Sequence, residues 1–190
     1  MVMVQPAKTK PYMNAEAFMA WYDKQPDGKR YELLDGIVHE LQSERVAHAR
    51  AKARVHTMFS RQIARRKLPC EALPDGMAVR VYDDVVFEPD ALVRCGPLLH
   101  GNDVIVIDPV IVVEVASPST QSIDALHKLT LYFRNPHIIH YLIVLPARKM
   151  VIHHRRLADG QMHSAIAGEG AVTFDPPGLT LDVTDLFSDT

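Results

Sequence analysis

The chain has 190 residues, with a hydrophobic content of 47%, a charged content of 23% and a formal net charge of −2. These values are typical of a globular protein that can bury a substantial core without disulfides or a structural metal. No apolar run reaches the roughly 18 residues that a membrane span requires, and the N-terminus carries no secretory leader, so neither a membrane protein nor a secreted one is expected.

The organisation that we predict is simple. Residues 1–12 form a loose tail, and residues 13–187 form one domain. Cys70 and Cys95 are too few for a disulfide framework, and in a chain without a leader we expect them to be reduced thiols in a cytoplasmic protein.

The first predicted elements are a helix, a hairpin and a second, longer helix. Asn14 is a suitable N-cap for a helix over 15–24. Alternating residues on both sides of an Asp-Gly pair predict a hairpin of strands 31–34 and 37–41. A helix over 46–67 follows, and its apolar stripe is predicted to comprise Val46, Ala49, Ala53, Phe59 and Ile63.

This long helix is basic. Between Arg45 and Lys67 the chain has eight Lys or Arg residues and no Asp or Glu, although the whole chain is slightly acidic. A local excess of positive charge can attract a polyanion, but it is also compatible with an ordinary solvated helix face.

The second half of the chain alternates strands with one helix. Strands are predicted over 70–73, 77–81 and 85–93, with Pro89 interrupting the third. A loop over 95–108 leads to a buried strand over 110–115, and a helix capped by Ser119 or Thr120 runs to about residue 134. Further strands are expected over 138–145, 149–156, 162–166 and 179–183. The order predicts an α/β fold bordering on α+β, with a mixed central sheet flanked by helices.

Three carboxylates occupy strand positions where an apolar residue would be expected. They are Glu32 in the hairpin, Asp90 after Pro89, and Glu114 near the end of the most apolar strand. A buried carboxylate is costly unless it is paired or holds a metal, and Mg²⁺ takes oxygen ligands, often one or two carboxylates with waters. Asp90 and Glu114 could meet across neighbouring strands, but a Pro-Asp pair followed by a distant Glu is by itself a common pattern.

The combination of motifs is more specific. Pro89-Asp90 is followed by Glu114-Val115-Ala116-Ser117-Pro118-Ser119-Thr120 and then by Asp124, Lys128 and Tyr132, which share a helix face at intervals of four residues. Together with Glu32 and with His48-Ala49-Arg50, these residues resemble the Uma-type putative restriction endonuclease family of the PD-(D/E)xK nuclease superfamily.

The resemblance implies a restriction-endonuclease-like fold and a metal-dependent endonuclease that hydrolyses DNA phosphodiester bonds with Mg²⁺ or Mn²⁺. It makes Asp90 and Glu114 the metal ligands and Lys128, Glu32 and Asp124 the candidate catalytic residues. The superfamily's usual lysine position, two residues beyond the acid, is Ala116 here, and the family's lysine on the following helix matches Lys128 instead.

The remaining candidates are a nucleic-acid contact face and two accessory residues. Arg50, Lys52, Arg54 and Arg61 are predicted to contact phosphates, and His48 and Tyr132 to be accessory residues. Two other functions stay open at this point. One is a catalytically inactive domain that binds nucleic acid or a protein partner, and the other is a structural protein whose basic helix is merely solvated. A homodimer is a further option.

Overall fold

The structure is a computed structural model, and it describes residues 12–116 and 123–188, with the side chains of 123–126 left out. Its centre is a six-stranded mixed sheet, in which β8 and β9 are parallel neighbours joined through helix α3 (Ile123–Tyr132). The strand order of this sheet is β11 (Met162–Ala167), β10 (Met150–Arg156), β9 (His140–Leu145), β8 (Pro109–Val115), β6 (Ala91–Cys95) and β3 (Cys70–Pro74).

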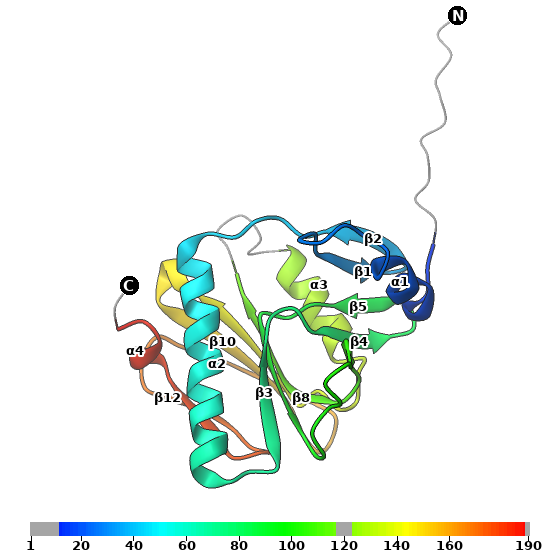
Figure 1. Cartoon of the computed structure of the whole chain (residues 1–190). Coiled ribbons are helices and arrows are strands. Elements are labelled where there is room, and N and C mark those ends of the chain that lie inside the picture. Colours follow the sequence, from blue (N-terminus) through cyan, green and yellow to red (C-terminus); the bar gives the residue numbers. More distant parts are fainter. Residues whose placement is uncertain (1–11, 117–122, 189–190) are drawn as a thin grey trace, which may run out of the picture.

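A five-stranded sheet stands beside it, and a two-stranded sheet lies near the C-terminus. The five strands are ordered β2 (Ile37–Glu40), β1 (Tyr31–Leu34), β5 (Val85–Phe87), β4 (Ala78–Tyr82) and β7 (Ile105–Val106). The two-stranded sheet pairs β12 (Ala171–Phe174) with β13 (Leu179–Asp182), and the short helix α4 (Val183–Leu186) follows. Helix α1 (Ala15–Tyr22) packs on β1, with Asn14 accepting a hydrogen bond from the Ala17 N–H as the predicted cap (Figure 1).

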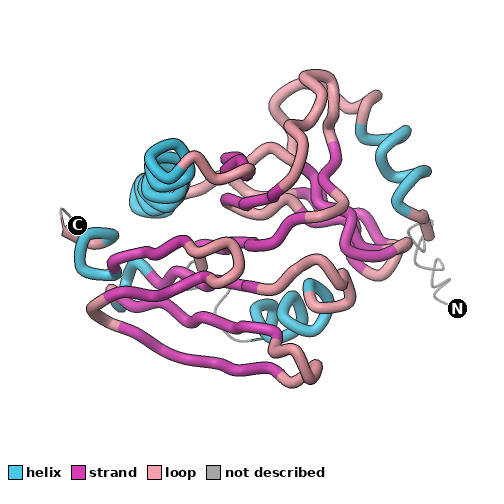
Figure 2. Tube along the Cα trace, turned by 90° about the horizontal axis from the view of Figure 1, so that it is seen from below, coloured by secondary structure: helices cyan, strands magenta, loops and turns pink. Residues whose placement is uncertain are grey.

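The two long helices cover opposite faces of the six-stranded sheet, as Figure 2 shows. Helix α2 (Val46–Arg66) packs against Ile111 and Val113, whereas α3 packs on the side of Val112, because successive strand residues point to opposite faces. This mixed arrangement confirms the predicted fold class. None of the helices within the described parts of the chain is both long and apolar enough to cross a membrane.

Helix α2 is rotated relative to its predicted orientation. Its buried side chains include Ala51, Val55, Phe59 and Ile63, which follow one another at intervals of four residues, while Val46 is 66% exposed. Burying a Phe or Ile side chain stabilises the fold by about 1.5–3 kcal/mol, so Phe59 and Ile63 determine which face is covered. The predicted stripe was therefore correct at these two positions and wrong at Val46, Ala49 and Ala53.

Pro89 separates two sheets. The segment predicted as one interrupted strand over 85–93 is divided into β5, in the five-stranded sheet, and β6, in the six-stranded sheet. Since proline has no N–H to donate, the ladder ends there and the chain is free to change sheets. Asp90 follows directly, at the junction of the two sheets.

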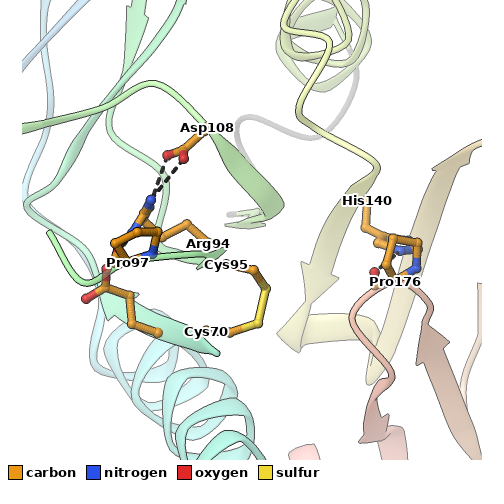
Figure 3. The surroundings of a disulfide bond; sticks show 8 residues. Cys70, Arg94, Cys95, Pro97, Asp108, His140 and Pro176 are labelled. Carbon is orange, nitrogen blue, oxygen red and sulfur yellow. Dashed lines mark hydrogen bonds and ion pairs between the residues drawn. A yellow bond between two sulfur atoms is a disulfide. The ribbon is translucent and has the colours of Figure 1, made fainter. Parts of the chain in front are cut away.

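The two cysteines form a disulfide in the structure, so the prediction of reduced thiols was wrong. Cys70 on β3 and Cys95 on β6 are registered directly opposite each other, which places their sulfur atoms within bonding distance (Figure 3). Next to this bond, the Arg94 guanidinium forms ion pairs with Asp108 at 2.9 Å and with Glu71 at 3.0 Å. The edge strand β3 is thus linked to β6 by the disulfide and by the ion pair between Glu71 and Arg94.

Candidate active site

Asp90, directly before β6, lies beside the part of the neighbouring strand β8 that carries Glu114. The backbone N–H of Asp90 donates to the carbonyl of Val113 at 2.9 Å, and the N–H of Val115 donates to Asp90 Oδ2 at 2.6 Å. Asp90 is therefore fixed between the two residues that flank Glu114. These bonds bring Asp90 next to the backbone on either side of Glu114, and that the two carboxylates share a cation stays a prediction.

Asp90 is surrounded by cationic and hydrogen-bonding groups. His48 Nε2 lies 3.0 Å from Asp90 Oδ2, and Lys52 Nζ lies 3.5 Å from Oδ1. Burial favours the neutral acid, but the His48 hydrogen bond and charge, the Val115 N–H and the Lys52 charge together hold the pKa of Asp90 below its usual value. Asp90 is consequently an ionised carboxylate at neutral pH.

Lys128 connects the other two carboxylates. Its Nζ lies 3.0 Å from Glu114 Oε1 and 3.0 Å from Glu32 Oε1, while the Tyr132 hydroxyl donates to Glu114 Oε1 at 2.6 Å. Glu32 also accepts the Glu88 N–H at 3.0 Å. The N-terminal hairpin, the central strand and helix α3 thereby meet at one ammonium group.

Helix α3 presents Lys128 and Tyr132 on one face, one turn apart, as the sequence predicted. Both reach Glu114. Asp124 belongs to the same helix, but its side chain lies outside the described residues, so the structure does not relate it to the site.

The protonation of Glu114 is finely balanced. Burial, together with the charges of Asp90 and Glu32, raises the pKa of Glu114 to about 7, even though Lys128 and Tyr132 act in the opposite direction. Although burial opposes the charge on Lys128, Glu114 and Glu32 hold its pKa well above the usual value. Lys128 is thus a cation at neutral pH, and the Tyr132 hydroxyl, whose pKa burial raises further, is a hydrogen-bond donor.

The donor set is suited to a hard divalent cation. In the described parts of the chain, no group of three or more His, Cys, Asp or Glu side chains is arranged to hold a metal. Mg²⁺ often binds through one or two carboxylates and keeps several waters, so Asp90 and Glu114 stay the predicted ligands. Burial first, and then the charges of Asp90 and Glu32, raise the pKa of Glu114, and a cation at this position would offset those charges.

The predicted phosphate-contacting residues separate into two groups. Arg50 and Arg61 are exposed on α2. Lys52 is buried among carboxylates, and Arg54 is half-buried and donates to the carbonyl of Leu186 at 3.0 Å. At about 100° per residue, Lys52 lies on roughly the opposite side of the helix from Arg50, which explains why the prediction that it contacts phosphates was wrong.

Glu88 is a site residue that the sequence did not reveal. It is buried directly before Pro89-Asp90 and accepts from Arg30 Nε at 2.5 Å and from the Tyr22 hydroxyl at 3.4 Å. The available signal was a second acidic residue in a strand otherwise composed of apolar side chains. Its partner Arg30 could not be identified, because it is distant in sequence.

Comparisons with known proteins place this site in a family. A family model described as "Putative restriction endonuclease", Uma2, matches residues 15–184. An "Uncharacterized protein slr1290" from Synechocystis sp. (strain ATCC 27184 / PCC 6803 / Kazusa) is 26% identical over 145 residues, which are 76% of this chain and 74% of that protein.

A solved structure has the same fold. The crystal structure of "a putative nuclease belonging to DUF820" from Anabaena variabilis ATCC 29413 superposes with a TM-score of 0.69 at 18% identity, covering 93% of this chain and 98% of that one. The family match extends over most of the chain and over every element that builds the site, and it confirms the family expected from the motifs. The chain belongs to the Uma2 family, described as putative restriction endonucleases.

Proposed function

We propose that this protein is a metal-dependent endonuclease that hydrolyses phosphodiester bonds of DNA. The observation that carries the proposal is that Asp90, directly before β6, is hydrogen-bonded to the neighbouring strand β8, which carries Glu114, with the Lys128 ammonium 3.0 Å from Glu114. Family membership supports the reaction class, and the carboxylate pair supports dependence on Mg²⁺ or Mn²⁺.

Asp90 and Glu114 would hold the cation. When bound, it would supply Lewis-acid polarisation of a phosphoryl oxygen and a lower pKa for a bound water. Asp90 is suited to this role because His48 and the Val115 N–H fix its orientation before any ligand arrives. Glu114 completes the pair once it is ionised.

Lys128 would stabilise negative charge on the phosphate. Its ammonium is protonated at neutral pH, so it acts as a positive charge and a proton donor in hydrogen bonds, not as a base. Glu32 and Glu114 hold this group in place from two sides. Glu32 therefore acts in this mechanism by positioning Lys128, while Arg50 and Arg61, which are exposed on α2, would contact the DNA backbone.

The test combines metal binding and cleavage. Asp90→Asn keeps the size of the side chain but removes its charge, so we expect calorimetry to show loss of Mn²⁺ binding and a gel assay to show loss of plasmid nicking. Asp159→Asn, an exposed turn residue, is the matched control and should behave as wild type. Metal-independent nicking, or nicking that Asp90→Asn leaves intact, would refute the proposal.

A domain that binds nucleic acid without cutting it is the second candidate. It is favoured by one observation: Asp90 and Glu114 are both already paired with cations or donors of the protein itself. This candidate predicts DNA binding with no Mn²⁺-dependent heat and no strand breaks, so the same two measurements distinguish it from the enzyme.

A further inference from the structure

Lys52 lies on the inward side of α2, one helical turn after His48. Its side chain is 7% exposed, and its ammonium is surrounded by three carboxylates. It forms ion pairs with Glu44, with Asp75 at 2.7 Å and with Asp90 Oδ1 at 3.5 Å. A lysine is rarely buried to this extent unless it is paired, and here every partner is an acid.

The acids come from three separate places in the chain. Glu44 precedes α2, Asp75 follows β3, and Asp90 stands at the junction of the two sheets. Arg30 contacts the two outer acids, at 3.1 Å from Glu44 and 3.4 Å from Asp75. Lys52 is therefore the cation that links this acidic cluster to Asp90. Although burial opposes its charge, the hydrogen bonds that Lys52 donates to Asp75 and Glu44 raise its pKa, so it remains protonated.

A cavity of about 350 Å³ lies beside this cluster and opens to solvent. Its wall includes Glu44, Lys52, Asp75 and Asp90, and the small side chains of Ala49 and Ala53 leave the space clear along α2. A cavity of this size has room for a hydrated ion. Without the Lys52 ammonium, the three carboxylates of the wall would lose the cation that they share, and only Arg30, beside Glu44 and Asp75, and His48, beside Asp90, would remain next to them.

We propose that Lys52 is a positioning residue for Asp90 and a fixed counter-cation that keeps a second divalent cation out of this cavity. The proposal rests on the proposed function, because it assigns the metal to the pair Asp90 and Glu114. One oxygen of Asp90 is held by His48 and the Val115 N–H, and Lys52 is next to the other. The site then takes one divalent cation, and the ammonium occupies the position that a second one would need.

The first experiment counts bound ions. Titration calorimetry with Mn²⁺ alone should give one ion per chain for the wild type and two for Lys52→Met, because the substitution exposes Glu44, Asp75 and Asp90 to the cavity. Lys52→Arg keeps the charge and should bind one ion. In Lys52→Met/Asp75→Asn the extra ion should be lost. Two ions in the wild type, or a single ion with unchanged Kd in Lys52→Met, would overturn the proposal.

A second variant keeps Lys52 and protects the test against misfolding of Lys52→Met. In Glu44→Gln/Asp75→Asn the ammonium retains only Asp90 of its three partners, so it competes with the metal for that carboxylate. We expect Mn²⁺ affinity to fall roughly tenfold, the order of one charge interaction at a partly buried site. A purely structural Lys52 predicts an unchanged Kd, and that result would contradict the positioning role.

Different results would refute the proposed function and the proposed role of Lys52. If the wild type binds no Mn²⁺ and nicks no DNA, the proposed function is refuted. The role of Lys52 would still be upheld if Lys52→Met gained one ion that Asp75→Asn removes, and refuted if it gained none.

Discussion

Glu114 is the residue at which pH should control the site. Only its ionised form can bind a cation, and its pKa is raised to about 7, first by burial and then by the charges of Asp90 and Glu32. Binding therefore releases a proton when the pH is below about 7. Mn²⁺ affinity should weaken as the pH falls below this value and level off above it.

Tyr132→Phe tests whether Glu114 determines the pH dependence of Mn²⁺ binding. The hydroxyl donates to Glu114 Oε1 at 2.6 Å, and hydrogen bonds to charged groups contribute about 1.5–3 kcal/mol. Without it the pKa of Glu114 rises further, so the midpoint of Mn²⁺ binding against pH should move upward by about one to two units. Calorimetric titrations at several pH values measure the midpoint. Tyr82→Phe, at an exposed position, is the control, and an identical midpoint in Tyr132→Phe would contradict the assignment.

The carboxylates of the candidate site could be singled out from the sequence, whereas the position of Lys52 could not. Asp90 and Glu114 interrupt predicted apolar strands, which the sequence itself shows. The interval of four residues between Lys128 and Tyr132 predicts that they share a helix face. The role of Lys52 depends on the rotation of α2. That rotation is set by the packing of Phe59 and Ile63 on the sheet. The apolar residues of this helix recur too irregularly in the sequence to define it.

At the scale of elements, the neighbouring strands β9 and β10 each contribute one histidine to a hydrogen-bonded pair, His140 and His153. His140 Nε2 lies 2.9 Å from the Pro176 carbonyl, which can only accept, so this nitrogen carries the proton. His140 Nδ1 then accepts from His153 Nε2 at 3.0 Å. Figure 3 shows His140 beside Pro176, away from the disulfide. Burial lowers the pKa of His140 and of His153 to about 4.

This pair should make the protein sensitive to acid. In the unfolded chain a histidine takes up a proton near pH 6.5, whereas the folded pair resists protonation down to about pH 4. The free energy of unfolding should therefore fall as the pH is lowered from about 6.5 to about 4, by up to about 3 kcal/mol for each histidine.

Chemical denaturation at pH 7.5 and at pH 4.5 measures this loss. His153→Gln can still donate to His140 but has no ring to protonate, so its loss of stability in acid should be smaller than that of the wild type. The exposed His39→Gln provides the control. An equally large loss in His153→Gln would show that other groups cause the acid sensitivity.

The elements themselves were largely predictable, and the errors have physical causes. Caps and turns are local, so α1, the first hairpin and the boundaries of α2 agree closely with the sequence. The two-residue β7 is too short to leave a pattern, and β12 was missed because its alternation covers only four residues. The disulfide depends on the register of β3 against β6, which no local signal determines.

For the whole molecule, the distribution of charge matters more than the net value of −2. Arg50 and Arg61 are exposed and lie within roughly 20° of each other around α2, on the side away from the sheet. Each contact with a DNA phosphate releases counterions, which makes affinity depend on salt in proportion to the number of contacts. If this face binds DNA, each of the two arginines adds its own contribution to the salt dependence of the affinity.

We therefore expect Arg50→Gln/Arg61→Gln to reduce the slope of log K against log salt by up to about 2, and to weaken binding at low salt whatever the DNA sequence. Anisotropy of a labelled duplex, without divalent cations so that no strand is cut, measures both quantities. Lys24→Gln/Lys29→Gln removes the same charge from exposed positions between α1 and β1 and is the matched control. If DNA is attracted only by the overall charge, both double variants should bind DNA equally weakly. A slope that changes only when the α2 arginines are removed would identify this helix face as the surface that follows the phosphate backbone.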